Sequence, residues 1–134
     1  MKFYRVAALV LAAGFLLVGA LFLAVPDGVI SFFNRMSGPL GLPEAPPVGH
    51  SFFLILTSGY MYLVSLLAWL MFKHPENRAF SLILAHGKSA SSLLSLGFFI
   101  AHRPFLIYLA NFLVDGLVAG GVLWMSRTRG PGKR

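Results

Sequence analysis

The chain has 134 residues, of which 57% are apolar and only 11% are charged. A soluble domain usually carries about 25% charged residues, and a fold of this size buries only about two-thirds of its surface. This composition excludes a soluble enzyme, a disordered regulator and a nucleic-acid-binding domain. The chain has no cysteine, which also excludes a disulfide scaffold, cysteine-based metal sites and thiol catalysis. We therefore expect an integral membrane protein.

Four long apolar windows predict four membrane-spanning helices, because a bilayer core of about 30 Å needs about 20 apolar residues per helix. Short polar turns that contain a proline separate the second, third and fourth windows, so these helices should be antiparallel neighbours. The first window is too long for a signal peptide, and we expect it to be retained. The prediction is an all-α, antiparallel four-helix transmembrane bundle that forms one domain over residues 1–134, with spans at about 6–25, 51–72, 79–101 and 105–126.

The basic residues predict the orientation of these spans. If the N-terminus is inside, eight of the 11 Lys and Arg residues lie in inner segments, and only Arg35 and Arg103 lie in outer ones. The positive-inside rule then places both termini on the cytoplasmic side of the plasma (inner) membrane. The basic tail at 127–134 is expected to touch anionic lipid as a topology anchor, without a role in nucleic-acid binding.

The outer segment, residues 27–49, contains the only long connection. Asp27 is predicted to cap a short amphipathic interfacial helix over residues 28–36. Two interpretations are open at this point. The helix is either a connector that lies on the outer leaflet, or a lid over a cavity between the spans.

Polar residues at membrane depth are costly and are usually paired or functional. Each of the last three windows carries such residues at helical spacing, so each is expected to present one polar face toward the others. The sets are Ser51, Ser58, Tyr62 and Ser65 on the second window, Ser81, Lys88, Ser95 and His102 on the third, and Tyr108, Asn111 and Asp115 on the fourth.

The depth of these residues predicts a site. At about 1.5 Å per residue, Tyr62, Lys88 and Asp115 all lie about 15–16 Å from the inner boundary. We predict a buried Lys88–Asp115 ion pair whose hydrogen bonds are completed by Tyr62 and a serine. The pair is either a latch that fixes helix register, or a polar site for a ligand, a proton or a quinone head group. The candidate polar layer comprises Tyr62, Lys88, Ser92, Asn111 and Asp115.

His86 is a secondary candidate. It lies two residues from Lys88, about 200° round the helix, so it should point elsewhere, toward a neighbouring subunit or the first span. Haem ligation would need a second ligand at matching depth, and His86 has none within the spans. His50 and His102 match each other at the outer boundary, where interfacial anchoring explains them. We expect no intrinsic cofactor and no metal, although a quinone or a lipid fits the polar layer.

Small residues predict close helix contacts, either within the bundle or with another protein. Gly116 and Gly120 form a GxxxG motif on the fourth window, and Ala8, Ala12 and Gly19 form a weaker line on the first.

Several short features occur in order along the chain. Arg5 precedes the small-residue-rich first span, which ends at Pro26, and Phe32 and Phe33 lie in the outer segment. Leu40-Gly41-Leu42-Pro43 and a short turn with Arg78 follow. This layout resembles the DoxX-like small four-helix membrane proteins of bacteria. Ala24-Val25 stands where that family usually has a Lys-Leu pair, and the second span lacks the family's Glu. The resemblance implies association with quinone-linked electron-transfer complexes.

The sequence contains no nucleophile–base–acid set, no phosphate-binding loop and no HExxH motif, so an enzyme is not favoured. The leading expectation is a small non-catalytic subunit of a larger membrane assembly, such as a respiratory or other electron-transfer complex, with membrane lipids and other integral membrane subunits as partners. The alternative is a stand-alone binder or carrier of a small hydrophobic or quinone-like ligand. A homo-oligomeric channel is disfavoured by the few polar groups. A polar cavity open to the lipid or to the outer face would favour the ligand binder. A dry core with an apolar flank larger than contact with lipid requires would favour the subunit of an assembly.

Overall fold

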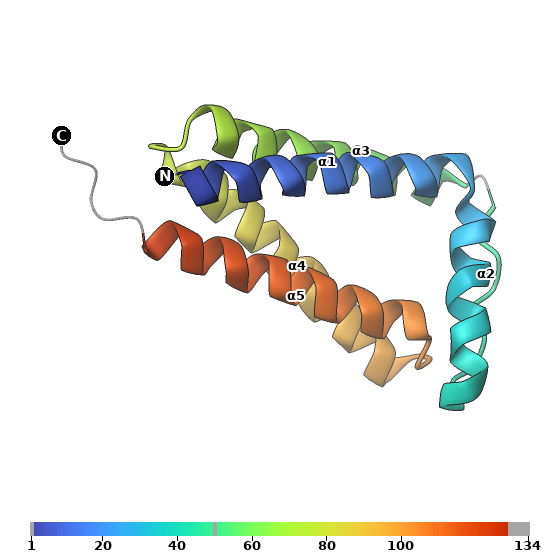
Figure 1. Ribbon diagram of the computed structural model, residues 1–134. Helices are drawn as coiled ribbons and strands as arrows, with labels where there is room; N and C mark the ends of the chain where they lie inside the picture. Colours follow the sequence, from blue (N-terminus) through green and yellow to red (C-terminus); the bar gives the residue numbers. More distant parts are fainter. Residues whose placement is uncertain (1, 50, 129–134) are drawn as a thin grey trace.

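The computed structural model describes residues 2–49 and 51–128 (Figure 1). The described residues are helical with no strand, which confirms the all-α class, and four of the helices are long and apolar enough to cross a membrane. His50 and residues 129–134 lie outside the described residues. The predicted anchoring by His50 and most of the predicted basic tail, 127–134, therefore also lie outside them. The elements are α1 (Lys2–Ala24), α2 (Pro26–Ser37), the 3-10 turn η1 (Gly38–Leu40), α3 (Phe52–Lys73), α4 (Arg78–Ala101) and α5 (Leu106–Arg127).

The four long helices form two pairs. Helix α1 packs along α3, and α4 packs along α5. The pairs converge where α1 begins and diverge toward α2, which lies across the open end (Figure 1). The molecule is therefore a wedge and not an evenly packed bundle. The main apolar core occupies the closed end and includes Tyr4, Ala8, Ala68, Met71, Leu84, Ala85, Val122 and Met125.

Small residues bring α1 and α3 together, as the sequence predicts. Ala8 and Ala12 are buried, and the Ser65 hydroxyl on α3 donates a hydrogen bond to the Ala12 carbonyl at 2.8 Å. A Cβ atom added at Gly19 would lie 2.9 Å from the Cβ atom of Met61. The two helices can approach this closely only because position 19 has no side chain.

The GxxxG motif on α5 is only half used. A Cβ atom added at Gly116 would lie 3.1 Å from the Ser92 hydroxyl, so Gly116 does contact α4. A Cβ atom added at Gly120 would meet nothing within 4 Å. Gly120 therefore makes no close helix contact among the described residues, because the buried stripe of α5 runs through Ala119 and Val122. A contact of Gly120 with another protein stays a prediction.

The outer segment is ordered by two side chains. Helix α2 begins one residue before Asp27, because Pro26 suits a first helical position that needs no N–H. The prediction that Asp27 caps this helix is wrong. Its Oδ1 atom instead accepts hydrogen bonds from the backbone N–H groups of Val48 at 3.0 Å and Gly49 at 2.9 Å. The Asn34 amide exchanges two hydrogen bonds of 2.8 Å with the backbone of Ala45. The returning chain is thereby fixed alongside α2 (Figure 1).

The contact at Gly19 gives a stability prediction. Gly19→Ala should destabilise the protein by about 1–3 kcal/mol, because the added methyl group overpacks the contact with Met61. Gly14→Ala on the same helix is the matched control, since a Cβ atom there meets nothing within 4 Å. Thermal unfolding in mild detergent measures both. Equal melting temperatures for the two variants would contradict the close approach of α1 and α3.

Candidate functional site

The candidate site is built around one ion pair. The Lys88 Nζ atom on α4 donates a hydrogen bond to Asp115 Oδ1 on α5 at 2.8 Å. Both side chains are only 3% exposed, and both lie near the middle of their helices. The ion pair that depth and charge predict from the sequence is therefore present in the structure.

The ammonium group of Lys88 also contacts the other two long helices. Its Nζ atom lies 4.5 Å from the ring centroid of Phe15 on α1 and 5.2 Å from that of Tyr60 on α3. Cations are attracted to aromatic faces within about 6 Å. One charged group thus touches side chains from all three of the other long helices.

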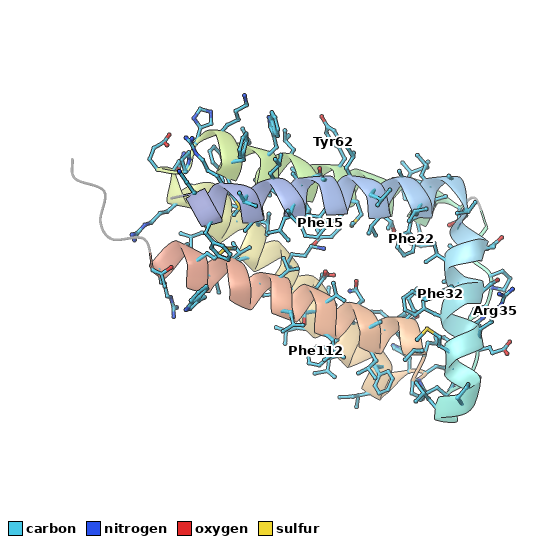
Figure 2. The ribbon with its side chains drawn as sticks, viewed as in Figure 1. Phe15, Phe22, Phe32, Arg35, Tyr62 and Phe112 are labelled. Carbon is cyan, nitrogen blue, oxygen red and sulfur yellow. The ribbon has the colours of Figure 1, made fainter. Side chains whose placement is uncertain are left out.

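Tyr62 does not take part in this site. Its side chain is 64% exposed and points away from the space between the helix pairs (Figure 2). The predicted rotation of Tyr62 about the helix axis is therefore wrong. Ser65, which shares the polar stripe assigned to α3, faces α1 and not α4. Tyr60, two residues earlier and so about 200° round the helix, lies at the site instead.

Sequence reasoning missed Tyr60. Its hydroxyl donates a hydrogen bond to the backbone carbonyl of Gly87 at 3.2 Å. A Cβ atom added at Gly87 would lie 3.9 Å from that hydroxyl. The one feature of the sequence that could have indicated Tyr60 is Gly87, directly before Lys88. A helix position without a side chain leaves room for an aromatic ring from a neighbouring helix.

Ser92 and Asn111 lie beside the ion pair and hold α4 against α5. The Ser92 hydroxyl donates to the Phe112 carbonyl at 2.8 Å. Asn111 Nδ2 donates to the hydroxyl oxygens of Ser91 at 3.2 Å and Ser95 at 2.7 Å. These bonds connect the predicted polar faces of the two helices, but none of them reaches the charged atoms.

One oxygen of the ion pair remains unpaired. Among the described residues, the buried Oδ2 atom of Asp115 has no hydrogen-bond partner. The expectation that Tyr62 and a serine complete the hydrogen bonds of the pair is therefore wrong. More than nine in ten buried polar groups in native proteins do find a partner, so this oxygen needs an explanation.

A cleft between the helix pairs leads to the ion pair. Its inner part has a volume of about 470 Å³ and is lined by Lys88 and Asp115 together with Phe15 and Tyr60. Its outer part has a volume of about 400 Å³ and reaches α2. Both parts are lined by Phe22, Thr57 and Asn111, so they adjoin each other. Phe15 and Phe22 point from α1 toward this space (Figure 2).

The outer segment covers the far end of the cleft. Pro26 and Ile30 of α2 are buried and line it, as do Ala45, Pro46 and Val48 of the returning chain. Arg35 points away from the other helices (Figure 2). The outer segment is predicted to be either a connector on the outer leaflet or a lid over a cavity. Its residues line the outer end of the cleft, which matches the lid.

His86 lies on an exposed face of α4, away from the buried Lys88, as its spacing predicts. Its Nδ1 atom is 2.7 Å from the Leu82 carbonyl, and because a carbonyl only accepts, Nδ1 carries the hydrogen. His102 stacks on Phe98 with ring centroids 5.0 Å apart. Over residues 2–49 and 51–128, no group of three or more His, Cys, Asp or Glu side chains is placed to hold a metal ion.

The chain matches no protein-family model, no curated protein and no solved structure. The resemblance to the DoxX-like proteins is therefore neither supported nor contradicted. The cleft and its ion pair are the features of the molecule that bear on function.

The ion pair gives a double-mutant prediction. Lys88→Met or Asp115→Leu alone should destabilise the protein by about 3–5 kcal/mol, because each leaves an uncompensated buried charge. The double variant should regain most of that loss, because two apolar side chains of similar volume replace the pair. Unfolding in detergent or in bilayers measures all three. A double variant no more stable than either single variant would show that the two residues are not coupled.

Proposed function

We propose that this protein binds or carries a small amphipathic, largely apolar molecule in the cleft between its helix pairs. It does so as a four-span antiparallel bundle in the plasma (inner) membrane, with both termini in the cytoplasm. The observation that carries this proposal is an apolar cleft that ends on a buried ion pair with an unused hydrogen-bond acceptor.

The lining of the cleft favours an amphipathic occupant. Its walls are mainly aromatic and aliphatic, and its charged groups lie at the inner end. Sites for small molecules have volumes of about 300–1,000 Å³ and combine apolar walls with a few convergent polar groups. An apolar body along the helices and a polar head at Lys88 and Asp115 match this pattern.

A purely structural latch explains less. A latch would serve best if the helices closed around it and every polar atom were paired. Here the pair lines a cavity between the helix pairs, and Asp115 Oδ2 lacks a partner among the described residues. Ionisable groups buried at membrane depth are usually functional.

The lid supports exchange with the outer leaflet. The hydrogen bonds of Asp27 and Asn34 join α2 to the returning chain, so the two form one cover over the outer end of the cleft, far from the core at the closed end. A membrane lipid and a quinone-like molecule both have the required amphipathic shape. A relationship to the DoxX-like proteins would favour the quinone.

Blocking the cleft tests the proposal. Thr57 lines both parts of the cleft, and its hydroxyl bonds only within its own helix, to the Phe53 carbonyl at 2.9 Å. Thr57→Phe should abolish co-purification of a bound molecule and change stability by less than about 0.5 kcal/mol. Native mass spectrometry of protein extracted from its own membranes measures the adduct.

Ile55→Phe is the matched control, because Ile55 is 66% exposed and does not line the cleft. The control should keep the adduct. If the wild-type protein carries no adduct of a few hundred daltons, or if Thr57→Phe carries as much as the control, the proposed binding function is wrong.

His86 favours a second candidate, a small non-catalytic subunit of a larger membrane assembly, such as an electron-transfer complex. A polar ring on an outward face at membrane depth is costly in lipid and gains a favourable environment against another protein. His86→Leu should then release larger chains that travel with the wild-type protein in the same experiment. Wild-type protein that travels without other chains would contradict this candidate.

A further inference from the structure

The inner end of the cleft restricts the head group that it can accept. Building on the proposed function, we propose that the bound molecule is electroneutral and carries a hydroxyl group that donates a hydrogen bond to Asp115 Oδ2. The molecule then belongs to the long-chain alcohols or phenols, and not to the fatty acids, amines, ethers or ketones. Of the quinone-like molecules, only the reduced, phenolic form carries such a hydroxyl group.

The requirement for neutrality follows from the charges in the cleft. Among residues 2–49 and 51–128, Lys88 and Asp115 are the only charged residues that line either part of it, and they neutralise each other. A charged head group would therefore find no countercharge in an apolar environment, where an uncompensated charge is strongly disfavoured. An uncharged head group leaves the balance of the pair unchanged.

The requirement for a donor follows from the hydrogen bonds already made. Lys88 donates to Asp115 Oδ1, and its ammonium group otherwise lies against the rings of Phe15 and Tyr60. Tyr60 donates to the Gly87 carbonyl, and Asn111 donates to two serines. An ionised carboxylate only accepts, and its Oδ2 atom has no partner among the described residues. The bond that the site lacks is one donated to this oxygen.

The oxygen can reach the cleft by a small movement. The Asp115 side chain lines the inner cavity but is almost fully covered. Rotation of the carboxylate about its Cβ–Cγ bond is a soft motion, because this torsion has a broad energy profile. An alcohol can then bond the carboxylate, whereas an ether or a ketone of the same length leaves it unpaired.

Matched probes test the head group. Purified wild-type protein in lipid nanodiscs receives dodecanol, dodecyl methyl ether, dodecanoate or dodecylammonium at equal mole fractions in the bilayer. Competition with a bound fluorescent alkyl phenol gives the relative affinities. We expect dodecanol to bind about 10- to 100-fold more tightly than the ether, because a hydrogen bond to a charged group is lost. Both ionic probes should bind more weakly than dodecanol.

A variant connects the preference to the carboxylate. Lys88→Met/Asp115→Asn keeps the side-chain shapes, removes both charges and places an amide where the carboxylate was. This variant should bind dodecanol and its ether with affinities within about twofold of each other. It avoids an unpaired Lys88 charge, so it remains informative if Asp115→Asn alone does not fold.

The outcomes separate this inference from the proposed function. Equal wild-type affinity for dodecanol and its ether would overturn the donor requirement but leave binding in the cleft intact. Equal affinity for dodecanoate or dodecylammonium would overturn the requirement for neutrality. A preference for dodecanol that survives in the double variant would show that Asp115 does not set it. If neither the fluorescent phenol nor any of the four probes binds the wild-type protein, both proposals fall.

Discussion

The burial of one ammonium group determines how the four long helices are arranged. Lys88 cannot remain charged in an apolar environment without compensation. Asp115 supplies the opposite charge from α5, while Phe15 and Tyr60 supply aromatic faces from α1 and α3. All four long helices must therefore meet at one level, and the rest of the structure is organised on either side of that level.

On the side nearer the start of α1, small residues and an apolar core close the wedge. On the other side the helix pairs separate, and α2 covers the resulting cleft (Figure 1). A tight end fixes the position of the charges, and an open end leaves space for a guest molecule beside them. The same ion pair thus serves as a structural junction and as the polar end of the cleft.

The sequence predicted those features that follow from composition and helical rise. The four spans follow from apolar length, and the pairing of Lys88 with Asp115 follows from depth and opposite charge. The prediction that needed the rotation of a helix about its axis failed at Tyr62, because rotation depends on which neighbours a helix packs against. The cleft could not be predicted, since it arises from the angle between two helix pairs.

The arrangement of the four long helices depends on a charged Lys88–Asp115 pair inside the membrane-embedded protein. Solid-state NMR on protein in lipid bilayers, labelled with ¹⁵N at lysine and ¹³C at aspartate, tests it most directly. We expect a strong dipolar coupling between Lys88 Nζ and Asp115 Cγ, and a chemical shift for Lys88 Nζ that is typical of an ammonium nitrogen. Absence of that coupling, or a neutral amine shift for Lys88, would show that Lys88 and Asp115 do not form a charged pair in the membrane.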